Sequence, residues 1–338
     1  MIVDVHGHLS APPELYAYQA NLIAHRGSHG RGRLSVSDDR IREAVTRPIA
    51  QHGGISHLDH LASGGIDVQL ISPRPYTMMH SEQPPQIVEW FAEATNDLIH
   101  RTCELFPDRF RGVAGLPQNP ATEPATWVRE LRRCVTDLGF VGCLLNPDPN
   151  EGQHPPAPGL GDRYWYPLYE ALCELDVPAL VHSAGCRPPA REPFSLHFIV
   201  EETIAVASLA RSSVFTDFPD LKIVVSHGGG AIPYQIGRFV ARGGDDFMAS
   251  LRRLWFDTCL YTKDSLELLL RTVGPDRCLF GTEKPGTGSA VDPATGRWFD
   301  DVRALLDEVD WLDGAQREAL LGGNARSLYR LAPAPVAG

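Results

Sequence analysis

The chain has 338 residues, 43% of them hydrophobic, and a formal net charge of −11. This length allows a large core in one domain, and the acidic balance without blocks of like charge argues against nucleic acid or an anionic membrane as a partner. Asp4 stands where a signal peptide would be basic, and no apolar run approaches the roughly 20 residues that cross a bilayer, so we expect a soluble, cytoplasmic protein.

Short apolar runs alternate with amphipathic stretches along the chain. Strands are predicted over residues 2–8, 66–73, 110–117, 140–147, 178–184, 221–229, 254–261 and 277–283. Helices are predicted, for example, over 85–105, 123–138, 163–176, 231–248, 264–273 and 314–330. Eight apolar strands in strict alternation with helices predict an α/β fold, a (β/α)₈ TIM barrel in a single domain over 1–332, with a short flexible tail over 333–338. An open doubly wound sheet is the alternative, but no G-x-G-x-x-G follows the first strand.

The cysteines indicate reduced, buried thiols. There are seven, an odd number, and none belongs to a C-x-x-C pair. Cys186 differs because it follows His182 in a loop rich in Pro and Gly, where a thiol can face a ligand. A loop cysteine without function is the favoured interpretation of Cys186.

The first predicted strand ends in an H-x-H pair, His6 and His8. Side chains at alternate positions of a strand share a face, so Asp4, His6 and His8 are expected to project together. With 13 histidines in the chain, chance alone gives roughly half an H-x-H pair, so the pair is weak by itself. Its place at the end of a buried strand, where an unpaired polar group is costly, favours metal binding over a core role.

Four further residues lie at or near other predicted strand ends. His182 closes the fifth strand, His227 the sixth and Glu283 the eighth, and Asp257 lies in the seventh. Three histidines and a carboxylate with one open position suit a catalytic zinc ion. His227 is predicted as a fourth ligand or general acid/base, and Glu283 as a ligand or base. Asp257 stays open between catalysis and capping the next turn.

Most other histidines fall in polar or loop contexts, and we expect most of them to be solvated: His25, His29, His52, His57, His60, His80, His100 and His154. His197 follows the loop after the fifth strand and is a candidate for substrate contact.

Several short motifs of the chain resemble those of a known family. "DVHGH", "VHS", "SHGGG", "FDT" and the acidic residue after "FGT" resemble the amidohydrolase superfamily, in the branch of the aminocarboxymuconate semialdehyde decarboxylases. Within that branch, "ISPRPYTMMH", "NPDP", "DRYWYPLYE", "HGGGAIPYQIGRF", "FDTCLY" and "VDPATGRWFDD" are most similar to the 4-oxalomesaconate hydratases of bacterial aromatic catabolism. The resemblance covers about residues 2–331.

The resemblance implies one zinc ion per subunit, with manganese as an alternative. The implied ligands are His6, His8, His182 and Glu283, with His227 beside them. It also suggests a homodimer or a larger oligomer.

The activity implied is a lyase reaction, hydration of an unsaturated oxo-polycarboxylate. A decarboxylase or hydrolase on the same metal site is the alternative, and a barrel used only for binding is disfavoured because every ligand lies at the catalytic end. The decarboxylases usually carry Asp where Glu283 stands, which favours the hydratase. The loop from Ser183 to Ser195, Phe198 in place of an expected tyrosine, and Lys284 with Pro285 depart from the hydratase pattern and leave the substrate open.

The predicted chemistry needs a metal, a proton carrier and a clamp for anions. Zinc lowers the pKa of bound water or polarises a substrate oxygen, and Glu283 or His227 moves protons. A small anionic carboxylate substrate needs basic partners in an acidic protein. Arg74 in "SPRP" is the first choice, and the other predicted contacts are Asn146, Cys186, Arg187, Arg191, His197 and Lys284.

Overall fold

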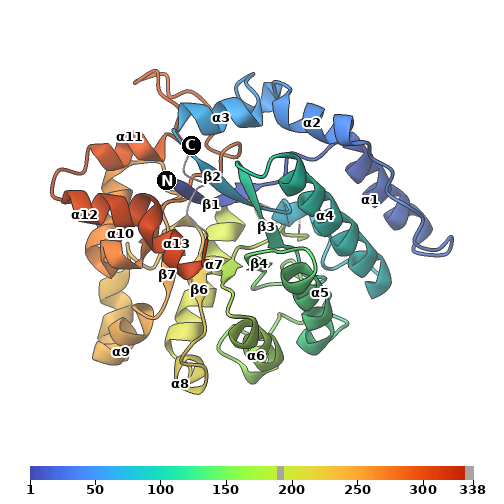
Figure 1. Ribbon diagram of the computed structural model, residues 1–338. Helices are drawn as coiled ribbons and strands as arrows, with labels where there is room; N and C mark the ends of the chain where they lie inside the picture. The colour runs from blue at the N-terminus through green and yellow to red at the C-terminus, as the bar shows by residue number, and fades with distance from the viewer. Residues whose placement is uncertain (189–193, 332–338) are drawn as a thin grey trace.

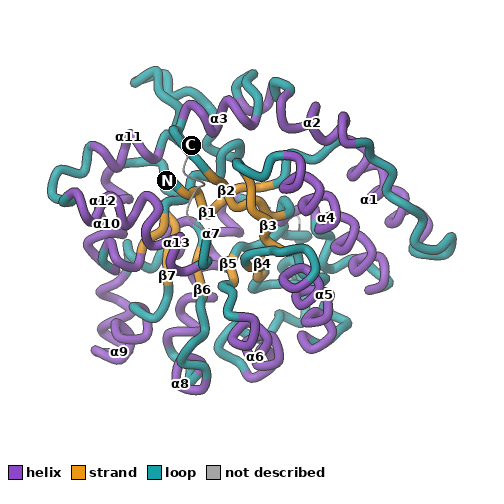
Figure 2. The backbone as a smooth tube through the Cα atoms, in the orientation of Figure 1, coloured by secondary structure: helices purple, strands orange, loops and turns teal. Residues whose placement is uncertain are grey.

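Eight short parallel strands stand at the centre of the molecule, surrounded by helices (Figure 2). The computed structural model describes residues 1–188 and 194–331. The strands are β1 (Val3–His8), β2 (Val68–Ser72), β3 (Phe110–Ala114), β4 (Gly142–Leu145), β5 (Ala179–Val181), β6 (Ile223–Val225), β7 (Trp255–Asp257) and β8 (Cys278–Leu279). They pair in the order β1-β2-β3-β4-β5-β6-β7-β8. The barrel predicted from the sequence is confirmed, with strands shorter than expected because their polar ends already belong to loops.

The sheet closes on itself between its first strand and the segment after its last. The Val5 amide donates to the carbonyl of Phe280 at 2.9 Å, and the Glu283 amide donates to the carbonyl of His6 at 2.8 Å. Glu283 is therefore fixed by its own backbone beside the end of β1.

The helices surround the strands in chain order (Figure 1). They are α1 (Pro13–His25), α2 (Asp38–Thr46), α3 (His57–Ser63), α4 (Pro85–Leu105), α5 (Pro124–Thr136), α6 (Tyr166–Leu175), α7 (Ser195–Ala210), α8 (Val214–Asp217), α9 (Ile236–Leu251), α10 (Lys263–Val273), α11 (Val302–Asp307), α12 (Gly314–Glu318) and α13 (Asn324–Leu328). The predicted helix 85–105 is confirmed residue for residue as α4, and 314–330 is α12 and α13 joined by a π-helical turn, Ala319–Gly323. Three helices, α1 to α3, fill the connection between β1 and β2.

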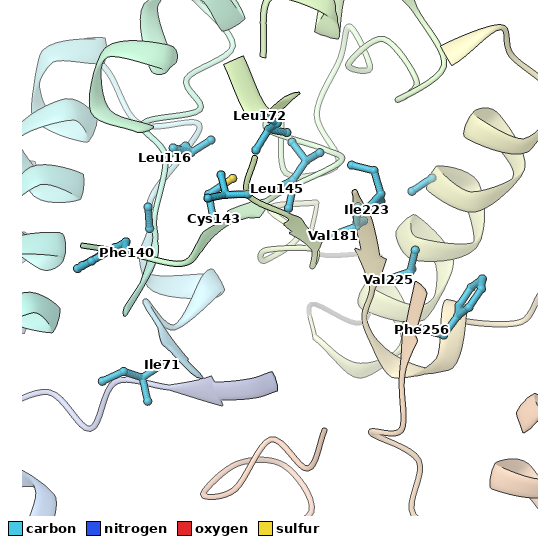
Figure 3. Close-up of a cluster of buried hydrophobic side chains, with 14 of the residues drawn as sticks. Ile71, Leu116, Phe140, Cys143, Leu145, Leu172, Val181, Ile223, Val225 and Phe256 are labelled. Carbon is cyan, nitrogen blue, oxygen red and sulfur yellow. The ribbon is translucent and has the colours of Figure 1, made fainter. Parts of the chain in front are cut away.

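The strands separate two apolar layers. Inside the barrel, Val5, Leu144, Leu180 and Val224 form one buried cluster, which Tyr329 closes from the end of α13. Their chain neighbours point outward and pack against helices, as Figure 3 shows for a cluster that includes Cys143, Leu145, Val181, Ile223, Val225 and Leu172 of α6. Alternate residues of one short strand thus build two separate cores.

The described structure holds no disulfide, and all seven cysteines are free thiols, four of them buried. The predicted burial holds for these four, whereas Cys103, Cys173 and Cys186 are half-buried, and the reduced state stays a prediction. No helix among residues 1–188 and 194–331 has the length and apolar character needed to cross a bilayer. The predicted tail over 333–338 and Arg191 lie outside the described residues.

Candidate metal centre

A β-bulge in β1 turns the H-x-H pair toward the barrel interior. Asp4 pairs with Gln69 and Gly7 with Ile71, so Val5 and His6 together face the single residue between them on β2. Such a bulge re-aims side chains and is common next to active sites. Asp4 was expected to project together with the two histidines, but its carboxylate has different partners. Its carboxylate accepts hydrogen bonds from the His6 amide at 3.0 Å, the Gln69 side-chain amide at 2.8 Å and the Thr282 hydroxyl at 2.6 Å, which ties β1, β2 and the segment after β8 together.

Three imidazoles and one carboxylate converge at the mouth of the barrel. His6, His8, His182 and Glu283 are buried, and one ligand atom from each lies within 4.8 Å of the others. The ring centroids of His6 are 5.2 Å from His8 and 4.9 Å from His182. The structure therefore gathers the four residues that the resemblance implied as ligands.

Each ring is held through Nδ1. The Nδ1 atoms contact the Asp257 carboxylate at 2.7 Å for His6, the Ser72 hydroxyl at 2.9 Å for His8 and the Ser183 carbonyl at 2.7 Å for His182. The Nε2 atoms of His6 and His182 are buried and have no hydrogen-bond partner in the described structure. Buried nitrogen atoms left without partners are costly unless a cation binds them. Rings fixed through one nitrogen, with the other free to bind, are the usual arrangement of metal-ligating histidines.

The electrostatics favour neutral rings at His8 and His182. Burial and the neighbouring His6 lower the pKa of His8 well below its usual value, and the same two causes act on His182. A neutral imidazole keeps the lone pair that a metal needs. Nitrogen from three histidines with oxygen from one carboxylate suits zinc and also manganese.

Glu283 completes this cluster from the loop after β8. Its Oε1 lies 3.9 Å from Nε2 of His8, and its Oε2 accepts a hydrogen bond from the Tyr261 hydroxyl at 2.9 Å. Glu283 has a positive φ of 62°, which is uncommon for a residue other than glycine. Gly286 follows with its backbone so close that a β-carbon there would lie 2.2 Å from the Glu283 carbonyl. The local backbone is thus shaped to point this carboxylate at the imidazoles.

His227 lies beside the cluster, paired with a buried glutamate. Its ring centroid is 5.2 Å from His6 and 5.0 Å from His182, and its Nδ1 is 2.9 Å from the Glu202 carboxylate. Burial lowers the pKa of His227, but the contact with Glu202 outweighs burial and raises it to about 10. Phe198 of α7 stacks nearly parallel to the His227 ring at 6.3 Å. His227 is thus a proton-carrying group next to the candidate ligands.

Asp257 contacts a ligand candidate and lies behind it. Both its oxygens are used, since Oδ2 contacts His6 and Oδ1 accepts from the Cys259 amide at 3.1 Å. Burial raises the pKa of Asp257, but His6 outweighs it and holds the pKa below its usual value. The carboxylate is therefore suited to orient His6.

The predicted basic contacts have different surroundings. Lys284 is 1% exposed and pairs with the buried Asp300 at 3.3 Å. Arg187 pairs with Glu151 at 2.8 Å and Glu82 at 3.0 Å.

Arg74 is different from both. It is half-buried, its guanidinium donates to the Pro285 carbonyl at 3.1 Å, and among the described residues no carboxylate lies within ion-pair distance of it. Of the predicted basic contacts that the structure describes, Arg74 is thus the one whose charge the protein leaves uncompensated.

The other predicted contacts lie around the loops after β4 and β5. Asn146 is buried. Its side-chain amide donates to the Asp148 carbonyl and accepts from the Asp148 amide, both at 3.1 Å, so it shapes this loop. His197 on α7 lies 4.0 Å from Asp148 and lines a cavity of about 660 Å³. Cys186 is half-buried beside Gly152.

Three histidines expected among the solvated ones are buried, which corrects that prediction. His57 is 1% exposed and bonds Ser10 at 2.9 Å and Gln69 at 2.7 Å, His60 is fully buried, and His80 is 3% exposed. The polar sequence context was misleading because α3 and the loop after β2 pack their histidines inward.

Sequence reasoning missed Glu202 and Tyr261, which hold His227 and Glu283. Glu202 lies in α7, a helix that was not predicted because its sequence is apolar on nearly all sides. Within that apolar run, the adjacent pair Glu201 and Glu202 was the available signal, since a carboxylate that is buried needs a partner.

Comparison with known proteins places the chain in a family. The Amidohydrolase family profile matches residues 3–331. The chain belongs to this family. It is 37% identical to a 2-keto-4-carboxy-3-hexenedioate hydratase from Sphingobium sp., covering 97% of this chain and 96% of the relative.

Solved structures agree with this assignment. A crystal structure of 4-oxalomesaconate hydratase from Rhodopseudomonas palustris superposes with a TM-score of 0.86 at 32% identity, covering 98% of this chain and 96% of the other. A dihydroxybenzoic acid decarboxylase from Polaromonas sp., solved with bound manganese, shares the fold, with a TM-score of 0.72 at 22% identity and coverage of 98% and 97%. The expected membership of the amidohydrolase superfamily is confirmed.

Proposed function

We propose that this protein is a metal-dependent hydratase that adds water to the double bond of an unsaturated oxo-polycarboxylate, of the kind named for its relatives. The observation that carries the proposal is the buried His6, His8, His182 and Glu283 cluster in a chain 37% identical to such a hydratase over nearly its whole length.

Zinc is the proposed metal. His6, His8 and His182 would hold it through Nε2 and Glu283 through Oε1, which leaves room for a substrate or water oxygen. The buried Nε2 atoms without partners support this assignment. When bound, the ion supplies a positive charge that polarises the substrate ketone and offsets the negative charge that develops on it during addition.

The proton transfers are assigned to Glu283 and His227. The name 2-keto-4-carboxy-3-hexenedioate describes a ketone at C2 conjugated to a double bond between C3 and C4. Water therefore attacks C4, its proton passes to the Glu283 carboxylate, and C3 takes a proton from His227. Tyr261 holds Glu283 in place, and Glu202 keeps His227 supplied with a proton. Asp257 acts through His6 as a positioning residue.

Substrate carboxylates need cationic partners, and Arg74 is our choice among the predicted set. Its charge is not compensated by a carboxylate of the described protein, whereas Lys284 and Arg187 already pair with Asp300, Glu151 and Glu82. A guanidinium binds a carboxylate through two parallel hydrogen bonds, which also fixes its orientation.

Mass spectrometry of 2-keto-4-carboxy-3-hexenedioate incubated with the metal-loaded protein tests the proposal. We expect a gain of one water, lost in Glu283→Gln, which keeps the size of the side chain and removes its charge. Loss of carbon dioxide would instead assign the protein to the decarboxylases, whose fold it shares. An unchanged substrate would overturn the proposed reaction.

A further inference from the structure

A second hollow opens beside the candidate metal centre, between the β1–β2 connection and the loop after β2. It has a volume of about 540 Å³ and is lined by Ser10, Tyr16, Arg47, His52, Arg74 and Tyr76 among others. Ser10 follows His8 by two residues, and Arg74 follows Ser72, the partner of the His8 ring, by two. Arg74 is also tied to Pro285, two residues after Glu283. Residues that line the hollow are thus linked, along the chain or by a hydrogen bond, to the segments that carry His8, Ser72 and Glu283.

Its charge is positive in a chain whose net charge is −11. Three arginines line the hollow, and one glutamate, Glu43, opposes them. Arg40 is engaged by Glu14 at 2.8 Å and by Glu43. Arg47 lies 3.7 Å from Glu43, which is a weak contact with an already shared carboxylate, and Arg74 pairs with no described carboxylate. A local cationic hollow of this kind concentrates anions that the rest of the acidic surface repels.

Hydroxyl donors accompany the charges. Burial raises the pKa of the Tyr16 hydroxyl despite the neighbouring Arg74, so this group stays protonated and can donate a hydrogen bond. Tyr76 offers a second hydroxyl from the turn that follows Arg74. Arginine with tyrosine is a donor set for carboxylates.

We infer that this hollow binds a substrate carboxylate remote from the ketone, and that it selects tricarboxylates over dicarboxylates. The inference rests on the proposed function, because it takes the ketone to lie at the metal cluster. Arg74 grips the substrate where the hollow meets the centre, and Arg47 with Tyr16 binds the far carboxylate. The helices α1 and α2 and the turn that carries His52 (Ala50–His52) thereby form the specificity element of the enzyme.

Calorimetric titration of the metal-loaded protein tests the hollow without turnover. The ligands are propane-1,2,3-tricarboxylate and the dicarboxylate succinate, which lacks one terminal carboxymethyl group of the tricarboxylate. Neither has a double bond to hydrate. We expect the tricarboxylate to bind more tightly, and Arg47→Gln to weaken its binding about tenfold, as the loss of one charge-assisted hydrogen bond predicts, with the succinate affinity unchanged. Arg42→Gln, on α2, the helix that ends just before Arg47, and paired with Asp39 at 3.3 Å, is the matched control and should bind both ligands like the wild type.

The outcomes separate this inference from the proposed reaction. Equal tricarboxylate affinity in wild type and Arg47→Gln, equal loss for both ligands, or no binding of the tricarboxylate to the wild type would each overturn the hollow as a carboxylate site. If binding depends on Arg47 as expected while the hydration assay shows no added water, the hollow stands and the proposed reaction fails.

Discussion

The inside of this barrel has two regions that are built from the same strands but differ in their side chains. Leu180 and His182 are two residues apart along β5 and its end, and they point the same way. Leu180 joins Val5, Leu144 and Val224 in a floor of apolar side chains, whereas His182 joins a mouth of imidazoles and carboxylates. The floor tolerates apolar side chains of similar volume, whereas the mouth depends on single atoms held at fixed distances. We therefore expect substitutions in the floor to change stability and substitutions in the mouth to change chemistry.

The largest expected effect is loss of a metal ligand. His182→Ala removes one of the nitrogen atoms without a partner, and we expect metal content well below one ion per chain and a loss of activity of at least about a thousandfold, since both the charge and its position are lost. Elemental analysis of the purified variant, with circular dichroism to show that it folds, is the measurement. Full metal content in this variant and in His6→Ala would refute the ligand assignment.

The second largest effect is expected from the apolar floor, at a residue of the strand that precedes His182. Leu180→Ala leaves a cavity in the floor, and we expect it to lower the free energy of unfolding by about 2 to 5 kcal/mol. Urea unfolding gives this value, and the metal content and KM of the folded fraction should match the wild type. If metal content fell as far as in His182→Ala, the separation of floor and mouth would be wrong.

These two regions also differ in how well the sequence predicts them. Alternating apolar residues such as Leu144 with Cys143 and Leu145 follow from the pleat of a strand, so the floor and the outer core could be predicted. The bulge at Val5 and His6 could not, since pairing register depends on the partner strand and appears nowhere in the local sequence.

The partners that the site side chains contact could not be predicted from the sequence either. The ligand candidates follow from strand ends and the family resemblance, but the ion pair of Lys284 with Asp300 and the contact of His227 with Glu202 join residues 16 and 25 positions apart through tertiary packing. The charge of Lys284 was visible in the sequence, and the direction of its side chain was not.

A smaller effect is expected from the residue behind His227. Glu202→Gln removes the carboxylate that raises the pKa of His227, while the described ligand candidates keep their contacts. We expect kcat to fall about 10- to 100-fold with metal content and KM close to wild type, since the proton supply alone is changed. Steady-state kinetics beside Glu201→Gln, the adjacent position on α7, provides the comparison. A drop in metal content would place Glu202 among the groups that support the metal instead.

The smallest effect concerns pH and the buried polar groups near the mouth. Burial lowers the pKa of His80 to about 4, against an ordinary value of 6.5 in the unfolded chain. Between these two values the unfolded chain binds a proton that the folded chain does not, so stability is lost as pH falls through this window and regained as it rises. His80→Gln removes this linkage and keeps a hydrogen-bonding group.

We expect the free energy of unfolding of the metal-free protein to fall by about 1 to 2 kcal/mol more in the wild type than in His80→Gln between pH 7 and pH 5. Urea unfolding at both pH values measures it, and other titrating groups cancel because both proteins carry them. An equal loss in both proteins would mean that His80 is open to protonation in the folded state. In that case its imidazole would belong to the solvated part of the mouth.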